Sequence, residues 1–393
     1  MKQINSQVLI IGTGLIGLIT SYCLLRQGYK IVIVEKNNIF KQKIGSLNDI
    51  RTVAIAEGSK LFLNKIGIWK KIKHFAQPIN KIDVIDRSPL SKIDFINNKQ
   101  KNLGYIIKNS IFHNILLKEL IKEKKLTILD NSFLYEIQYA ADKVVGCSNK
   151  YRISSDLLIA ADGKNSSIRK MLSTPIFKKA YPEKALVLNF THKENHQNTA
   201  YEFFYKNGPM AILPMKKTKN QFCSSMVWSN KPDFLESLFN SNNNFIKEFL
   251  NDQKKLPGGK IINVISKQLF PLSAHINSRF YEKRVIYIGD SAHSIHPIAG
   301  QGWNLGLRDI IKLNKLISEQ KKFGIPLGAE NFCENYNSSL YFDTFEMYQI
   351  TDKLNWLFKN NFFILNLFRK TGFNIINDNN KLKNKITKFA MGF

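Results

Sequence analysis

The stretch Gly12-Thr13-Gly14-Leu15-Ile16-Gly17 follows a largely apolar run, residues 7–11, of the kind that forms a strand buried on both faces of a sheet. Residues 15–27 have the length and apolar spacing of a helix, which Gly28 ends. Residues 31–34 are a second apolar run. This order predicts a strand–helix–strand unit, the opening of a parallel α/β sheet.

The three glycines of this stretch have different expected tasks. Gly12 permits a tight turn, Gly14 lets the backbone approach a pyrophosphate at the helix N-terminus, and Gly17 lets the helix pack closely on the strand. Glu35, at the end of the second strand, can accept hydrogen bonds from ribose hydroxyls. The pattern predicts a dinucleotide site and disfavours an apolar hairpin or membrane segment, but does not separate FAD from NAD.

Two strand ends far downstream carry the same chemistry. Residues 156–160 lead into Asp162-Gly163, which taken alone fits an ordinary strand-ending turn. Residues 284–288 lead into Gly289-Asp290, where the carboxylate can hold a polyol hydroxyl. The glycine-rich string that follows frees backbone amides at a helix start, and such amides stabilise the negative charge of a reduced flavin.

The bulk composition narrows the class of protein. A chain of 393 residues that is 44% hydrophobic can bury a large core. Its net charge of +28 comes from lysines spread along the whole sequence, which favours a solvated basic surface over nucleic-acid binding and leaves an anionic membrane as a partner. Four scattered cysteines and seven histidines show no metal-ligand spacing, so we expect no metal site and a reducing, cytoplasmic compartment. Residues 3–25 carry no charge, but their glycines argue against a signal peptide or membrane span.

The middle of the chain predicts a second domain. Short β-rich runs separated by polar turns indicate an antiparallel sheet; they are residues 185–191, 200–205, 211–214 and 222–228. From about residue 301 the pattern is helical. We therefore expect a discontinuous nucleotide-binding domain, an inserted β-sheet domain for the substrate and a C-terminal helical region. Their ranges are, in that order, 1–70, 101–175 and 275–330; 71–100 and 176–274; and 331–393.

Taken together, the three motifs resemble those of the class A flavoprotein monooxygenases, the family of para-hydroxybenzoate hydroxylase. The string 296–302 with residues 304–309 behind it is similar to the narrower group of ubiquinone-biosynthesis hydroxylases, as is the stretch 208–214. So are residues 51–55 with Ser59 and residues 67–69 after them. The resemblance covers nearly the whole chain and is loose only in 70–100 and 230–265. It implies a para-hydroxybenzoate hydroxylase-like, Rossmann-like α/β fold that binds FAD.

The resemblance also implies roles for individual residues. The FAD pyrophosphate, ribose and ribityl chain would lie at the glycine turn, at Glu35 and at Asp290. Arg51 matches an arginine that reaches the FAD phosphates, and Asp162-Gly163 a motif in contact with FAD and reduced nicotinamide. Trp303 stands where this group more often has leucine. The full set of implied cofactor-binding residues is Gly12, Gly14, Gly17, Glu35, Lys36, Arg51, Lys108, Asp162, Gly163, Asp290, Gly300, Gln301, Gly302 and Asn304.

The implied reaction is hydroxylation of the aromatic ring of a polyprenylated phenol in ubiquinone biosynthesis, through a flavin C4a-hydroperoxide formed from O2. The reductant would be NAD(P)H, bound transiently, or an electron-transfer protein. Pro297 matches a position whose carbonyl faces the substrate hydroxyl, and His296 is an acid/base candidate. We assign His293 to packing beside the flavin loop.

Other readings remain open at this point. A polyprenyl reductase, a hydroxylase of another aromatic compound, or a non-catalytic FAD scaffold in a biosynthetic complex share the first and third motifs, whereas the Trp-x-Trp pair of flavin halogenases is missing. A polyprenyl tail calls for a channel toward the membrane, and the aromatic stretch 354–373 could rest on the inner membrane face. Its aromatic and basic members are Trp356, Phe358, Lys359, Phe362, Phe363, Phe368 and Arg369. Packing onto the FAD lobe is the favoured use of this stretch.

Overall fold

Four buried strands form the centre of the molecule in this computed structural model, which describes residues 1–39, 49–86, 91–96, 102–253, 256–360 and 363–392. They are β2 (Val8–Ile11), β3 (Ile31–Val34), β13 (Leu157–Ala160) and β20 (Val285–Tyr287). With β9 (Leu126–Leu129) and β19 (Tyr281–Glu282) they make a sheet of order β19-β20-β13-β2-β3-β9. All neighbours except β19 and β20 are parallel, so the motif-bearing strands end at one edge. The predicted α/β fold is confirmed.

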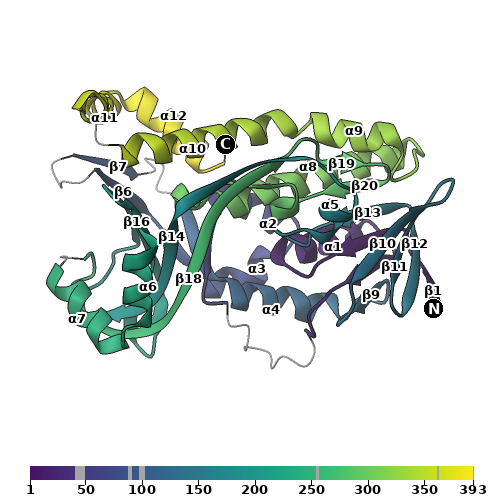
Figure 1. Cartoon of the computed structure of the whole chain (residues 1–393), viewed down its shortest axis with the longest axis horizontal. Coiled ribbons are helices and arrows are strands. Elements are labelled where there is room, and N and C mark those ends of the chain that lie inside the picture. The colour runs from purple at the N-terminus through teal and green to yellow at the C-terminus, as the bar shows by residue number, and fades with distance from the viewer. Residues whose placement is uncertain (40–48, 87–90, 97–101, 254–255, 361–362, 393) are drawn as a thin grey trace.

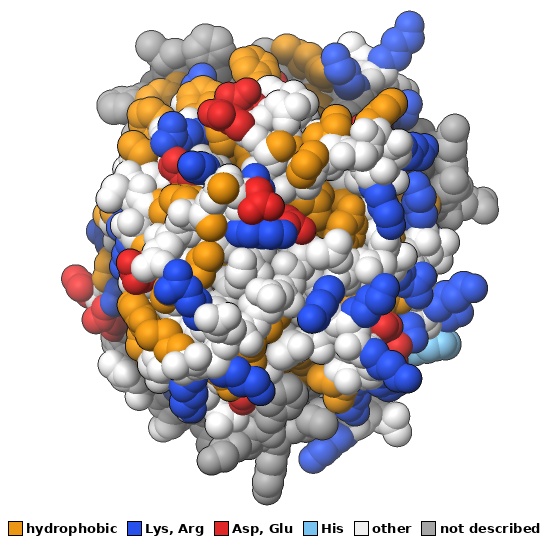
Figure 2. Space-filling model, turned by 90° about the vertical axis from the view of Figure 1, so that its right-hand side faces the viewer, with side chains coloured by type: hydrophobic (Ala, Val, Ile, Leu, Met, Phe, Trp, Pro, Cys, Tyr) orange, Lys and Arg blue, Asp and Glu red, His pale blue; other side chains and the backbone are white. Residues whose placement is uncertain are grey.

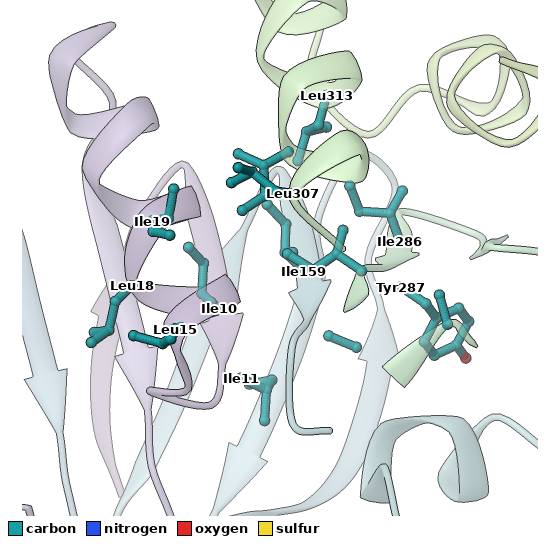
Figure 3. Packing of buried hydrophobic residues seen from close by; sticks show 14 of the residues in the cluster. Ile10, Ile11, Leu15, Leu18, Ile19, Ile159, Ile286, Tyr287, Leu307 and Leu313 are labelled. Carbon is teal, nitrogen blue, oxygen red and sulfur yellow. The ribbon is translucent and has the colours of Figure 1, made fainter. Parts of the chain in front are cut away.

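Two helices pack against this sheet through apolar side chains. Helix α1 (Leu15–Arg26) follows the glycine turn, and α8 (Gly302–Lys322) follows the third motif. Figure 3 shows Leu18 and Ile19 of α1 and Leu307 and Leu313 of α8 gathered with Ile159 of β13, and each of these side chains is at most 1% exposed. Full burial of one such side chain contributes roughly 1.5–3 kcal/mol, so this cluster fixes where the helix N-termini lie at the sheet edge.

The second large sheet has eight strands in the order β21-β18-β14-β17-β16-β15-β6-β7. The expected β-rich runs lie within four of them, but the strands extend further along the chain than the runs. The strands are β6 (Lys81–Asp86), β7 (Lys92–Ile96), β14 (Ile176–His192), β15 (Thr199–Tyr205), β16 (Gly208–Thr218), β17 (Gln221–Asn230), β18 (Ile261–Asn277) and β21 (His293–Ser294). One pair differs from the antiparallel expectation: β15 and β6 are parallel, because β6 comes from a distant part of the chain and not from a hairpin.

The long strands β14 and β18 connect the two sheets. Each has 17 residues, and they run antiparallel from the core of the second sheet toward the first, as Figure 1 shows. Strand β18 also pairs with the two-residue β21, which carries His293 of the third motif. Helices α6 (Pro232–Asn240) and α7 (Asn243–Gln253) cover one face of the second sheet, and the opposite face is turned toward the first sheet.

Smaller elements complete the two lobes. One three-stranded sheet has the order β4-β8-β5, and one four-stranded sheet has the order β1-β12-β11-β10. Strand β5 falls in the segment expected in the β-sheet domain, yet it pairs with β8 beside the nucleotide lobe. The bounds are β1 (Lys2–Asn5), β4 (Thr52–Ala56), β5 (Gln77–Ile79), β8 (Gly104–Lys108), β10 (Leu134–Tyr139), β11 (Val144–Ser148), β12 (Tyr151–Ser155), α2 (Glu57–Lys65), α3 (Trp69–Ile72), α4 (Asn109–Leu120) and α5 (Ser167–Met171).

The C-terminal helices confirm the predicted helical region. They are α9 (Glu330–Ser338), α10 (Tyr341–Lys359), α11 (Phe363–Asp378) and α12 (Asn380–Ala390). Figure 1 shows α10 running along the molecule from the first sheet to the second, where α11 and α12 lie beside β7. Among the helices of the described residues, none combines the length and the apolar character that a bilayer crossing requires.

Much of the aromatic C-terminal stretch faces the protein. The ring of Phe358 is 8% exposed and stacks on Phe204 of β15 with ring centroids 3.6 Å apart. The buried guanidinium of Arg369 donates to Asp86 of β6 at 2.9 Å. Trp356 is 54% exposed, and the side chains of Phe362, Phe363 and Phe368 lie outside the described residues.

The molecular surface agrees with a solvated basic exterior. On the face drawn in Figure 2, the Lys and Arg side chains are distributed among apolar, polar and acidic ones and do not form one continuous basic patch.

Candidate functional site

The glycine turn lies between β2 and α1 at the edge of the first sheet. Gly12 has a φ of +105°, and a Cβ there would lie 2.6 Å from the carbonyl oxygen of Ala161. A Cβ on Gly17 would lie 2.3 Å from the carbonyl oxygen of Gly12. A Cβ on Gly14 would meet no atom within 4 Å. Two of the glycines are thus required by close packing, whereas the third borders open space in front of the helix N-terminus.

The buried carboxylate of Glu35 stabilises this turn. One of its oxygens accepts hydrogen bonds from the backbone amide of Thr13 at 2.9 Å and from the Thr13 hydroxyl at 2.7 Å. The other accepts from the amide of Asn37 at 2.9 Å, and Lys36 between them is exposed. His113 of α4 lies on the other side, with Nε2 at 2.9 Å from the Thr13 carbonyl oxygen. Glu35 is therefore a structural support of the turn as well as a candidate ribose ligand.

The second strand end forms a helix cap. One oxygen of Asp162 accepts from the amide and hydroxyl of Ser167 at 2.7 and 2.9 Å, at the start of α5. Its other oxygen is buried and has no hydrogen-bond partner among the described residues. Gly163 has a φ of +82°, and a Cβ there would meet nothing within 4 Å. Like Gly14, it borders open space at the sheet edge.

A buried arginine joins the second and third motifs. The guanidinium of Arg169 donates to the carbonyl oxygens of Lys164 at 2.7 Å and of Ser291 at 3.1 Å, and one of its nitrogens lies 2.9 Å from Nε2 of His275 on β18. Burial and the positive charge of Arg169 lower the pKa of His275 to about 3, so this imidazole is neutral and can accept the hydrogen bond. Arg169 thereby fixes the turn that carries Asp162 against the turn that carries Asp290.

Asp290 lies at the end of β20 in a position open to solvent but enclosed by the protein. Its side chain is exposed, yet desolvation by the surrounding protein raises the pKa of its carboxyl, an effect that the charges of His293, Arg51 and Lys164 partly offset. Accessibility combined with desolvation is what a side chain in a cleft experiences. Three cations from three separate segments thus converge on Asp290.

Arg51 and Lys108 lie on neighbouring strand ends. The guanidinium of Arg51 forms a two-pronged ion pair with Asp49 at 2.8 Å for both contacts, and the Asn109 side-chain amide donates to the same carboxylate. Burial disfavours the ionised form of Asp49, but the Arg51 and Asn109 hydrogen bonds outweigh it and lower its pKa. Thr52 is the register partner of Lys108, so the two predicted phosphate ligands are brought together.

The loop after β20 is held by a buried ion pair. Nε2 of His293 lies 2.7 Å from the carboxylate of Asp309 on α8, which also accepts from the amide of Gly289 at 2.8 Å. Burial alone would lower the pKa of His293, but the Asp309 carboxylate raises it above its ordinary value. A packing role for His293 fits this arrangement.

The two catalytic candidates lie on the same loop in different environments. His296 is 1% exposed and packs edge-on against Tyr181 with ring centroids 4.7 Å apart. Burial lowers its pKa to about 4, and its Nδ1 accepts from the amide of Ile298 at 3.3 Å, so the ring is neutral at pH 7. Pro297 is exposed, and its carbonyl oxygen accepts from the Gly300 amide at 3.1 Å, which leaves one lone pair for another donor. Both roles stay predictions.

The remaining loop residues are fastened to other parts of the chain. Gly300 has a φ of +60°, and Gly302 begins α8. The side-chain amide of Gln301 donates to the carbonyl oxygen of Ala390 on α12 at 3.2 Å. The buried amide of Asn304 spends its oxygen on the Ala56 amide and the Ser59 hydroxyl, and its nitrogen on the Ala54 carbonyl. Asn304 therefore clips α8 to β4, and only its backbone remains for a cofactor.

Four supporting residues were not identified from the sequence: Thr13, His113, Arg169 and Asp309. Thr13 and Arg169 lie within the quoted motifs, so their polar side chains were the available signal. Asp309 closes the third motif, and its burial beside His293 could be expected from a helix that packs on the sheet. His113 gives no local signal, because only the tertiary fold places α4 against the glycine turn.

Comparison with known proteins settles the family. The family model described as FAD binding domain matches residues 5–322. The chain belongs to this FAD-binding family. It is similar to ubiquinone hydroxylase UbiL of Rhodospirillum rubrum, at 28% identity over 98% of this chain and 90% of that protein. It is 24% identical to the 3-demethoxyubiquinol 3-hydroxylase of Escherichia coli over the whole length of both chains.

The fold is shared with solved FAD-dependent monooxygenases. The p-nitrophenol 4-monooxygenase PnpA of Pseudomonas putida superposes with a TM-score of 0.81 at 18% identity, covering 100% of this chain and 98% of that one. PqsL of Pseudomonas aeruginosa, a probable FAD-dependent monooxygenase, gives a TM-score of 0.75 at 17% identity, with 94% and 99% covered. The para-hydroxybenzoate hydroxylase-like fold and the identity of FAD as cofactor, which the glycine motif alone left open, are confirmed.

The residues present fit FAD. The N-terminus of α1 has first-turn amides with no carbonyl partner inside the helix, and the neighbouring Gly14 leaves room for a pyrophosphate. Gly163 leaves similar room beside the orphaned oxygen of Asp162, and Asp290 lies in the same enclosed region. FAD requires anion-binding amides, hydroxyl acceptors and open space in one cleft, and the three strand ends supply them.

The two kinds of glycine should respond differently to substitution. In Gly17→Ala the methyl group would collide with the backbone oxygen of Gly12, so we expect the thermal unfolding midpoint of the apoprotein to fall, at a cost of roughly 1–3 kcal/mol. Gly14→Ala should leave this midpoint unchanged but weaken FAD binding, because its methyl group occupies only the space of the pyrophosphate. Scanning calorimetry and FAD titration measure both. Equal effects of the two variants would contradict the assignment.

His296 should make the stability of the protein depend on pH. Its pKa rises from about 4 in the folded state to about 6.5 in the unfolded state, so the unfolded chain binds more protons as the pH falls. Stability should be complete above pH 6.5 and decrease between pH 6.5 and 4, with a loss of about 2 kcal/mol from this group between pH 7 and 5. Denaturant unfolding of wild type and His296→Gln at both pH values isolates this contribution. Parallel losses in the two proteins would refute it.

Proposed function

We propose that this chain hydroxylates the aromatic ring of a polyprenylated phenol in ubiquinone biosynthesis, with FAD as cofactor, O2 as the oxygen source and NAD(P)H or an electron-transfer protein as the reductant. The observation that carries the proposal is the convergence of the turns at Gly14, Gly163 and Asp290 on one cleft that faces the second sheet. Curated relatives named ubiquinone hydroxylases, matched over nearly the whole chain, support the substrate class.

Each cofactor ligand has a proposed part. The α1 amides and Arg51 would bind the pyrophosphate, Glu35 the adenosine ribose and Asp290 the ribityl chain. The backbone of residues 300–304, at the positive end of α8, would face the flavin ring, and a helix N-terminus stabilises negative charge there. Reduced FAD supplies electrons that activate O2 for transfer of one oxygen atom to the ring.

The protein's own task in this reaction is positioning. Residues 1–70, 101–175 and 275–330 would hold FAD, and residues 71–100 and 176–274 would hold the phenol. The free lone pair of the Pro297 carbonyl could accept a hydrogen bond from the substrate hydroxyl, which raises the electron density of the ring. Apolar walls exclude water, which otherwise diverts the activated oxygen.

A basic cavity supports a nucleotide as the transient reductant. Its volume is about 450 Å³, and its lining includes Lys164, Lys170 and Lys178 together with Arg169. It borders the Asp162-Gly163 turn, so a phosphate-bearing reductant bound there would lie beside the flavin cleft. NAD(P)H carries such phosphates.

Asp290→Ala should separate flavin binding from folding. We expect this variant to purify largely without FAD, because the ribityl chain loses its acceptor, and to lose phenol-dependent consumption of O2 and NAD(P)H. Asp142→Ala, at an exposed turn, is the matched control and should keep both. Flavin absorbance and mass spectrometry of a hydroxylated short-chain prenylphenol are the measurements. A full flavin content in Asp290→Ala would mean that the third motif is misassigned, and a flavin-loaded wild type that hydroxylates no prenylphenol would overturn the function.

We also propose that the protein works in the cytoplasm, in peripheral contact with an anionic membrane face and with other proteins of quinone synthesis. Trp356 and Phe389 are 54% and 41% exposed, and α12 carries four lysines within 11 residues. Exposed aromatic rings beside cations are the composition of interfacial contacts.

The double variant Trp356→Ser/Phe389→Ser should bind vesicles that contain anionic lipid more weakly than wild type in co-sedimentation. Phe342→Ser, which removes a ring that is 78% exposed at the other end of α10, serves as the control and should bind as wild type does. Unchanged binding of the double variant would rule out this contact surface.

A further inference from the structure

Glu202 lies in the middle of β15 on the face of the second sheet that is turned toward the flavin cleft. Its neighbours Tyr201 and Phe203 pack with the cluster under α6 and α7. Because successive side chains of a strand point to opposite faces, Glu202 points away from that cluster. A carboxylate thus stands on the inner face of the proposed substrate domain.

The residues on either side of Glu202 on the same face locate it relative to the flavin loop. Ala200 packs in one apolar cluster with Ala54, whose Cβ lies 3.3 Å from the position of a Cβ on Gly300. Phe204 packs in another with Ile298. Glu202 lies between two side chains that each reach the 298–300 segment, so it faces the same loop.

The surroundings of this carboxyl group are apolar. Its register partners are Ala211 on β16 and Val84 on β6. Within the described part of the chain, Glu202 makes no hydrogen bond or ion pair. The charged groups on adjoining elements have partners of their own, Asp86 with Arg369 of α11 and Glu183 with Lys359 of α10. The nearest imidazole on the loop, His296, is neutral at pH 7.

Glu202 is partly accessible even though the protein around it is dense. Its side chain has intermediate exposure, while desolvation raises the pKa of its carboxyl to about 8. A surface glutamate would be fully hydrated, and a structural one would have a cation or donor beside it. An unpaired carboxyl group in an apolar recess costs folding free energy that a polar ligand can offset.

On this basis, and resting on the proposed phenol hydroxylation, we propose that Glu202 is a catalytic residue that receives the hydrogen bond and the proton of the substrate's ring hydroxyl. The substrate O–H bond breaks, a carboxyl O–H bond forms, and the electron pair stays on the phenolic oxygen. The resulting phenolate donates electron density to the ring carbon that receives the oxygen atom. The proton returns to that phenolic oxygen after transfer, so no additional oxidant or reductant takes part.

The base form of Glu202 is the carboxylate, so the hydroxylation rate should depend on its ionisation. In wild type, the single-turnover rate should rise with pH and level off above about pH 8, since the carboxyl group then no longer carries its own proton. A wild-type rate that is flat from pH 6 to 9 on a prenylphenol would overturn the proposal without any variant.

Glu202→Gln keeps the shape of the protonated side chain and removes the base. We expect normal flavin content, a turnover rate lowered on the order of 10²-fold, a KM changed much less, and no rise in rate toward pH 8. A fluorinated prenylphenol, whose hydroxyl is more acidic, should recover part of the rate, and Glu202→Asp should restore the pH dependence in part. Glu136→Gln, an exposed glutamate on β10, is the matched control and should behave as wild type.

The outcomes separate this inference from the proposed function. If wild type hydroxylates the prenylphenol and Glu202→Gln does so with the same rate and pH profile, the role of Glu202 is refuted and the function stands. If wild type binds FAD but hydroxylates no prenylphenol, the function itself fails. If Glu202→Gln loses FAD, the pH profiles of wild type and Glu202→Asp still decide the question.

Discussion

The hydrogen bonds of one buried guanidinium hold the cofactor cleft together. Arg169 connects the turn after β13, the long strand β18 and the turn after β20, three segments that lie more than 100 residues apart in sequence at their extremes. Its acceptors are neutral carbonyl and imidazole groups, so its charge is not cancelled locally and contributes to a positive field at the cleft. Without these bonds, Asp162 and Asp290 would belong to two independent turns.

Much of the fold could be predicted because its strands are short apolar runs with polar turns at their ends. The order β2, α1, β3 follows directly from residues 7–34, and the two Asp-Gly strand ends mark β13 and β20. What the sequence could not specify was pairing between distant segments. The parallel contact of β15 with β6 and the pairing of β5 with β8 depend on tertiary packing, which has no local pattern.

The same division applies to the site. Gly12 and Gly17 could be assigned because a side chain at either position collides with backbone, a constraint written in the spacing itself. Asn304 and Glu35 were expected at the cofactor, but their side chains also support the surrounding protein, since a buried amide or carboxylate bonds whatever donors the fold brings to it. Glu202 drew no notice in a β-rich run, because its meaning comes from the absence of partners around it.

The attachment of α12 links the cleft to the order in which the chain is made. The amide of Gly58 donates to Met391 and the side chain of Gln301 to Ala390, so residues 390 and 391 fasten both α2 and the loop that would face the flavin. Translation delivers those two residues after every other part of the cleft. A nascent chain can build its glycine turn and central sheet early, but the loop is secured only near the end of synthesis. Premature closure around a flavin is thereby disfavoured, and a chain truncated before α12 would present an unfinished pocket.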